Sequence, residues 1–231
     1  MFEGYRSSFF DSLTILPKKK LEGFWFSHHI PKTAGTALRE SYQNTFGKRQ
    51  VFQLYEPSQV LRFERGDFSL LNTRPLIIHG HFKPTEYQVK NGTRVKRTVW
   101  LRDPVTRALS LLKHLIQTQN YKQEYKLLEK TFGASVKQLD EEKLYYFLSE
   151  PSFKHLNQPY QNYFKHISLN EFDFVGKVEN YSEDLERLGN YMGVKLRHFE
   201  RNVRDIGVTI DTQKFAHLLE KEYEVVKDYY E

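Results

Sequence analysis

Short apolar runs alternate along this chain with longer amphipathic stretches. The short runs are rich in β-branched and aromatic residues and predict strands at residues 23–30, 49–54, 76–79, 95–101 and 172–177. The amphipathic stretches predict helices at residues 35–45, from 104 onward, and at 121–149, 182–192 and 212–231. Strands that alternate with helices are typical of an α/β fold with a mostly parallel sheet covered on both faces. We therefore expect a single domain over residues 1–231, with a polar lead-in at residues 1–22.

The helix that follows residues 95–101 has a well-defined beginning. Asp103 can cap its first turn, and Pro104 fits the first helical position. The apolar residues after it recur at helical spacing on one face: Val105, Ala108, Leu109, Leu112, Leu115 and Ile116. In open parallel sheets, ligands bind beyond the carboxyl ends of the strands. Polar residues at those ends are therefore the first candidates for a site.

Composition narrows the chemistry. The chain carries a net charge of +6, and its 18 Phe and 15 Tyr are enough for a packed core. This charge suits an anionic ligand, but the longest cationic run is only Lys18-Lys19-Lys20, so a nucleic-acid partner is not indicated. The absence of cysteine excludes disulfides, thiolate catalysis and cysteine-based zinc sites. The first residues lack the apolar stretch of a signal peptide, and no run approaches the ~20 apolar residues that span a bilayer. If Met1 is the natural start, we expect a cytoplasmic protein.

The segment between the first predicted strand and the first predicted helix has the features of a phosphate-binding loop. It reads His29-Ile30-Pro31-Lys32-Thr33-Ala34-Gly35-Thr36-Ala37. A helix N-terminus offers unpaired amides and a partial positive charge, so the amides of residues 33–37 can wrap a phosphate. Lys32 can reach one of its oxygens, and the Thr36 hydroxyl can add a contact. A Walker A loop needs G-x-x-x-x-G-K-S/T, whereas here a single Gly follows the Lys, which argues against ATP or GTP hydrolysis. The alternative is a chance Pro-Lys-Thr turn.

A second anion site is predicted at the end of the strand at residues 95–101. There the chain reads Arg102-Asp103-Pro104-Val105-Thr106-Arg107-Ala108-Leu109-Ser110. The Arg102 guanidinium and the Ser110 hydroxyl, two turns along the helix, suit a phosphate distinct from the first. Arg107 lies four residues after Asp103, so we interpret it as the partner of that carboxylate in an ion pair.

Together the two motifs resemble those of the sulfotransferase superfamily. Residues 31–36 are similar to its 5′-phosphosulfate loop, P-K-T/S-x-G/S-T/S, and residues 102–110 to its 3′-phosphate motif, R-D-P-x-x-R-x-x-S. The resemblance implies the P-loop-like sulfotransferase fold, and as donor 3′-phosphoadenosine 5′-phosphosulfate (PAPS), whose two phosphate groups account for two anion sites. Residues 172–185 also resemble the F-V-G-R-x-E-N-x-x-x-D-L segment of carbohydrate sulfotransferases. We interpret that segment mainly as a core strand followed by a helix start.

A pair of histidines lies at the end of the predicted strand at residues 76–79. In Ile78-His79-Gly80-His81, the two imidazoles point to the same side of an extended chain, and Gly80 permits close approach of a ligand. The alternatives are a core histidine pair or half of a metal site, although no third ligand stands at a telling spacing. The segment resembles the H-G-H of the heparan sulfate and uronyl 2-O-sulfotransferase group. The resemblance implies that one histidine is the base on the acceptor hydroxyl. His81 is preferred because it lies nearer the carboxyl end of the strand, with His79 in support.

The expected function is transfer of a sulfuryl group from PAPS to a hydroxyl, most simply of a carbohydrate, without a metal ion. Lys32 and the loop amides would stabilise the charge that builds on the bridging oxygen, and a histidine would accept the proton. Two other functions stay open. One is a kinase-like nucleotide phosphotransferase, although a complete Walker-type set is missing. The other is a non-catalytic protein that binds polyanionic glycans.

Overall fold

A computed structural model describes residues 24–69, 77–86, 95–119, 121–199 and 210–230. The predicted lead-in at residues 1–22 and the first residue of the strand predicted at 76–79 lie outside these ranges. The protein is an α/β structure built on a five-stranded sheet in the order β2-β3-β1-β4-β5. Every pairing in this sheet is parallel. The bounds are β1 Phe24–His28, β2 Val51–Leu54, β3 Ile77–Gly80, β4 Val95–Leu101 and β5 Phe174–Lys177.

Alternating side chains along the strands supply a hydrophobic core on each face of the sheet, as the parallel arrangement requires. Trp25, Ile77 and Trp100 pack under α1 (Gly35–Phe46) and α8 (Tyr181–Met192) on one face. Their neighbours in sequence point to the opposite face, which is covered by α2 (Pro57–Glu64), α7 (Pro159–Tyr163) and α9 (Glu220–Tyr230). The predicted parallel sheet covered on both faces is thus confirmed.

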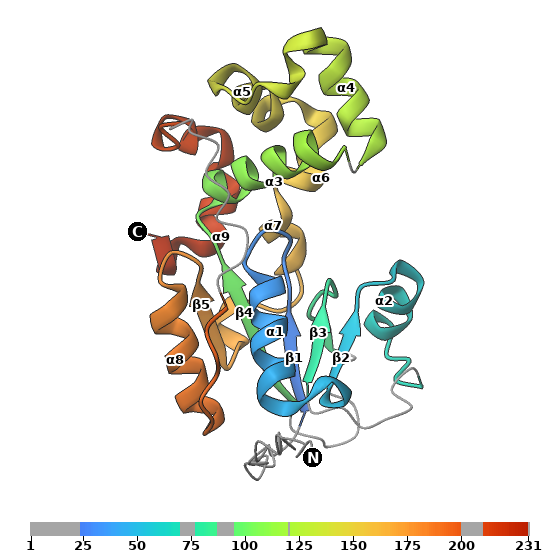
Figure 1. Ribbon diagram of the computed structural model, residues 1–231, viewed down its shortest axis with the longest axis vertical. Coiled ribbons are helices and arrows are strands. Elements are labelled where there is room, and N and C mark those ends of the chain that lie inside the picture. Colours follow the sequence, from blue (N-terminus) through green and yellow to red (C-terminus); the bar gives the residue numbers. More distant parts are fainter. Residues whose placement is uncertain (1–23, 70–76, 87–94, 120, 200–209, 231) are drawn as a thin grey trace, which may run out of the picture.

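A group of helices extends beyond the carboxyl ends of the strands (Figure 1). It contains α3 (Pro104–Thr118), α4 (Lys122–Phe132), α5 (Glu141–Ser149) and the short α6 (Lys154–Asn157). These helices share a hydrophobic core of their own, to which α3 contributes the apolar face read from the sequence. The charged stretch at residues 121–149 is therefore two helices, separated by a 3₁₀ turn at Gly133–Lys137 where Gly133 has φ 54°.

Local signals explain where most elements begin and end. The Asp103 carboxylate accepts from the Thr106 amide at 2.8 Å with Pro104 in the first turn, so the predicted cap of α3 is confirmed. Helix α8 ends at Gly193, whose φ of 68° suits glycine. Helix α2 was not predicted, although Pro57 follows Glu56 and the Glu56 side chain caps it through the Gln59 amide. The predicted last helix begins as a 3₁₀ segment at Gln213–Leu219 before α9.

Candidate functional site

The loop between β1 and α1 has an unusual backbone. Lys32 and Ala34 adopt left-handed conformations, with φ of 73° and 60°, on either side of Thr33. Such a conformation costs a non-glycine residue roughly 1–3 kcal/mol and persists where surrounding contacts impose it. Here Thr33 anchors the turn, because its hydroxyl donates to the Ile30 carbonyl at 2.8 Å and its amide donates to the same oxygen at 3.3 Å. Residues that alternate between left-handed and right-handed backbone conformations form a concave nest of amides that suits an anion.

The N-terminus of α1 is available to that anion. No side chain caps this helix, and the first amides of any helix lack intrahelical acceptors. Thr33, Gly35 and Ala37 are buried, whereas Lys32, Ala34 and Thr36 alternate with them and are half-buried. Lys32 and Thr36 therefore stay partly accessible, while the Thr33 hydroxyl is used inside the loop.

Cations from two elements lie close to this loop. Burial lowers the pKa of Lys32, and the nearby charges of Arg102 and Lys113 lower it further. His114, on α3 beside Lys113, also has a lowered pKa, through burial and then the charge of Lys32. The two predicted anion sites are thus neighbours, joined by the face of α3 that carries Ser110 and Lys113. Sequence reasoning missed Lys113, although its position three residues after Ser110 places it on the same helical face.

Arg107 has a different role from the predicted one. Its guanidinium is fully buried and donates to the carbonyl oxygens of Leu156 and Asn157, at 3.0 and 2.7 Å. The interpretation as an ion pair with Asp103 is therefore wrong. The Asp103 carboxylate is occupied by its own helix cap and by the Tyr223 hydroxyl. A spacing of four residues allows an ion pair in a helix, but here the Arg107 side chain crosses to the α6 segment instead.

His79 is a buried structural link among three segments. It is fully buried in β3, and its Nε2 donates to the Gly35 carbonyl at 3.1 Å while Nδ1 accepts from the Ser27 hydroxyl at 2.9 Å. Its ring stacks on His29, with centroids 5.3 Å apart and planes 14° from parallel. Burial, followed by the charge of Arg39, lowers its pKa to about 3. His79 therefore supports the start of α1 and is neutral at physiological pH.

His81 lies just beyond the end of β3, in a different environment. It borders a cavity of about 200 Å³ that also touches Pro31 of the loop between β1 and α1. Its Nε2 is buried and has no hydrogen-bond partner among the described residues. Burial lowers its pKa to about 4, so the imidazole is neutral near pH 7 and can accept a proton. Its ring packs against those of His29 and Tyr55, each with centroids 4.7 Å away.

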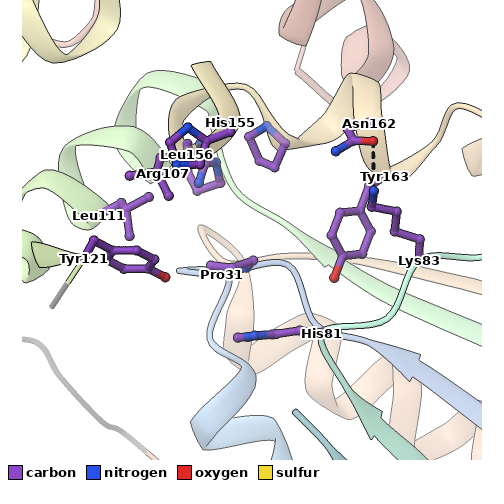
Figure 2. Close-up of a pocket in the computed structure, with 11 residues that line it drawn as sticks. Pro31, His81, Lys83, Arg107, Leu111, Tyr121, His155, Leu156, Asn162 and Tyr163 are labelled. Carbon is purple, nitrogen blue, oxygen red and sulfur yellow. Dashed lines mark hydrogen bonds between the residues drawn. The ribbon is translucent and has the colours of Figure 1, made fainter. Parts of the chain in front are cut away.

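The rest of the cavity is formed by α3, α6 and α7 and by the segment that follows His81 (Figure 2). Lys83 Nζ donates to Asn162 Oδ1 at 2.9 Å across one side. The Tyr163 hydroxyl donates to the His29 carbonyl at 3.1 Å, which ties α7 to the loop between β1 and α1. Sequence analysis did not identify the residues from α6 and α7, because nothing in their local pattern indicates a site.

Two glycines near the site are required by close packing. A Cβ on Gly35 would lie 2.1 Å from the His29 ring, and a Cβ on Gly80 would lie 1.9 Å from the Leu54 carbonyl oxygen. The sequence assigned Gly80 to the approach of a ligand. The structure gives Gly80 a packing reason of its own, since the backbone of the neighbouring strand β2 fills the space that a Cβ would need.

The segment at residues 172–185 forms β5 and the first turn of α8. Asp184 ties the two together, because its carboxylate accepts from the Lys177 amide at 2.7 Å. Among the residues that the structure describes, no group of three or more His, Asp or Glu is arranged to hold a metal ion. No helix in the described ranges is long and apolar enough to cross a membrane. Comparison of the sequence with protein-family models and with curated proteins gave no match.

Proposed function

We propose that this protein is a sulfotransferase with a P-loop-like fold that moves a sulfuryl group from PAPS to a hydroxyl, most simply of a carbohydrate. One observation carries the proposal. The nest of amides at Lys32–Ala34 and the uncapped start of α1 lie beside the cations Arg102 and Lys113, and a cavity with a neutral histidine adjoins them. Two candidate anion-binding elements side by side suit a donor with two phosphate groups, and the adjoining cavity offers a place for an acceptor.

Each group has a defined task in this scheme. The donor supplies the sulfuryl group, and the acceptor oxygen attacks sulfur as the bond from sulfur to the bridging oxygen breaks. Lys32 and the amides of the loop stabilise the charge on the departing 5′-phosphate, and loss of such a donor costs roughly 10²–10³-fold in rate. Arg102 and Ser110 hold the 3′-phosphate. No metal ion takes part.

His81 is the proposed base. Its Nε2 receives the proton of the acceptor hydroxyl, a step that contributes roughly 10²–10⁴-fold. Both nitrogens of His79 are already hydrogen-bonded inside the protein, so His79 acts as a support for the loop. Because the pKa of His81 is lowered to about 4, the acid limb of activity is expected well below the ordinary histidine range.

Calorimetry with the desulfated donor, 3′-phosphoadenosine 5′-phosphate (PAP), tests the donor site directly. PAP should bind more tightly than AMP, ATP or heparin fragments. A preference for ATP would favour a kinase-like phosphotransferase, and tight binding of heparin fragments without PAP binding would favour a glycan-binding protein. Equal affinities for PAP and AMP would remove Arg102 and Ser110 from the 3′-phosphate site.

His81→Ala tests the base. The variant should lose sulfuryl transfer and keep its affinity for PAP, whereas the exposed His166→Ala should behave as the wild type. Circular dichroism at each pH separates a loss of activity from a loss of folding. A His81→Ala enzyme with near-normal turnover and an intact acid limb would assign the base elsewhere.

A further inference from the structure

Tyr160 of α7 holds the corner of the chain where β4 leads into α3. Its hydroxyl accepts from the Arg102 amide at 3.0 Å and donates to the Arg102 carbonyl at 2.6 Å. One side chain thus binds both backbone groups of a single residue. Arg102 follows the last residue of β4, so its amide and carbonyl lie past the end of that strand. The two bonds restrict the peptide planes on either side of Arg102, and with them the direction in which its side chain leaves the backbone.

Tyr160 is itself fixed from several sides. It is fully buried, and its amide donates to the carboxylate of the buried Glu222 at 2.8 Å. The same carboxylate accepts from the Gln161 amide at 3.0 Å, so α9 clamps the beginning of α7. The Arg107 guanidinium lies over the Tyr160 ring, 5.9 Å from its centroid. Burial raises the pKa of Tyr160, so its hydroxyl keeps the proton that it donates.

The adjoining residue is fixed by separate contacts. The Asp103 amide donates to Glu179 at 2.9 Å, and the Asp103 carboxylate accepts from the Tyr223 hydroxyl. Side chains from three other segments therefore hold the Arg102–Asp103 corner. A site needs this kind of support when a guanidinium must meet a phosphate with two parallel hydrogen bonds, because that geometry tolerates little displacement.

We propose that Tyr160 is a positioning residue for the 3′-phosphate of the donor, acting through the backbone of Arg102. The inference rests on the proposed function, since it takes Arg102 as the 3′-phosphate ligand. Tyr160 does not touch the donor. Its hydroxyl determines how well the Arg102 guanidinium is aligned with the 3′-phosphate. Loss of the hydroxyl is therefore expected to weaken recognition of the 3′-phosphate alone.

Tyr160→Phe removes the hydroxyl and keeps the ring and its packing. We expect the dissociation constant for PAP to rise roughly tenfold, as for loss of hydrogen bonds that hold a charged ligand group. The affinity for AMP, which lacks the 3′-phosphate, should stay within about twofold of the wild-type value, since AMP leaves Arg102 unused. In steady-state kinetics the KM for PAPS should rise while kcat stays near the wild-type value. Tyr146→Phe is the matched control, because that hydroxyl accepts from Thr131 at 3.1 Å in the outlying helices.

The outcomes separate the inference from its premise. A wild-type protein that prefers ATP or heparin fragments over PAP overturns both the proposed function and the role of Tyr160. Equal wild-type affinities for PAP and AMP remove Arg102 from the 3′-phosphate site and so overturn the role of Tyr160. A wild-type preference that survives unchanged in Tyr160→Phe overturns only the role of Tyr160, as does an equal loss of affinity for PAP and AMP. If Tyr160→Phe fails to fold, Glu222→Gln loosens the same helix at its clamped end. An unchanged ratio of PAP to AMP affinity in that variant would also overturn the inference.

Discussion

Acid should destabilise this protein well above the pH at which its carboxylates titrate. The cause is the burial of several histidines, which lowers the pKa values of His29 and His81 among others. In His28 and His79 the pKa values fall to about 3, mainly by burial. Protonation of either would place a charge where no water is available. The His28 Nε2 is buried without a partner in the described residues, and its Nδ1 donates to the Phe82 carbonyl at 2.9 Å. In His79 both nitrogens are bonded, and the Nδ1 that would gain the proton accepts from Ser27.

The magnitude follows from the difference between the folded and unfolded chains. An unfolded histidine has a pKa near ~6.5, so below that pH the unfolded state binds more protons and stability falls as the pH falls. At pH 5 each histidine contributes a loss of about 2 kcal/mol, and the two together about 4 kcal/mol. This loss of stability does not depend on the exact pKa in the folded state, because any folded pKa below about 4 gives the same loss at pH 5. The free energy of unfolding of a typical domain is only ~5–15 kcal/mol, so this loss is a large part of it.

Urea unfolding followed by circular dichroism at pH 7.5, 6 and 5 measures this effect. His28→Asn retains a donor for the Phe82 carbonyl but cannot titrate, so its loss between pH 7.5 and 5 should be smaller by about 2 kcal/mol. His166→Asn, at an exposed position, should retain the wild-type pH dependence. A wild-type free energy of unfolding that stays flat from pH 7.5 to 5, or a His28→Asn variant with the wild-type slope, would refute the reasoning.

Three further predictions concern the loop between β1 and α1 and the neighbouring face of α3. Lys32→Ala should lower kcat roughly 10²–10³-fold while PAP affinity changes little, because the charge it stabilises develops during transfer; a change confined to KM in steady-state kinetics would contradict this role. Gly35→Ala should displace the His29 ring, which a Cβ would approach to 2.1 Å. The affinity for PAP, measured by calorimetry, should therefore weaken at least roughly tenfold. Wild-type affinity would show that the loop can adjust. Lys113→Ala should raise the KM for PAPS roughly three- to tenfold, and Lys113→Arg should restore the wild-type KM. Lys130→Ala, at an exposed position on α4, should have the wild-type KM. An unchanged KM in Lys113→Ala would remove Lys113 from the donor site.

The local pattern was sufficient for the architecture and for locating the loop between the first strand and the first helix. Short β-branched and aromatic runs separated by amphipathic stretches specify parallel strands, because each strand must be apolar on both faces. Asp103 and Pro104 mark the start of α3 through contacts within four residues. The loop at Lys32 was recognisable because a strand, a turn and a helix N-terminus are consecutive in the chain. Helix α2 and the break at Gly133 were missed, since their signals are short and carry little periodicity.

Side-chain partners that are distant in sequence were decided only by the tertiary structure. The roles of the two histidines in the H-G-H segment differ because Ser27 and Gly35 enclose His79, whereas His81 meets the cavity. The spacing of Arg107 in the helix allows an ion pair with Asp103. In the fold, packing places the α6 carbonyl oxygens next to the guanidinium, and Arg107 donates to them instead.

The sequence by itself determined which chemistry is present and at which ends of the strands it lies. The tertiary structure decided which groups act together. Tyr160 and Arg102 are 58 residues apart, and Tyr163 and His29 are 134 residues apart, yet both pairs are joined by hydrogen bonds. Periodicity reports only which face of an element is buried, and it contains no information about which other element covers that face. Only the folded chain, by packing α7 against the ends of β1 and β4, brings these pairs within bonding distance.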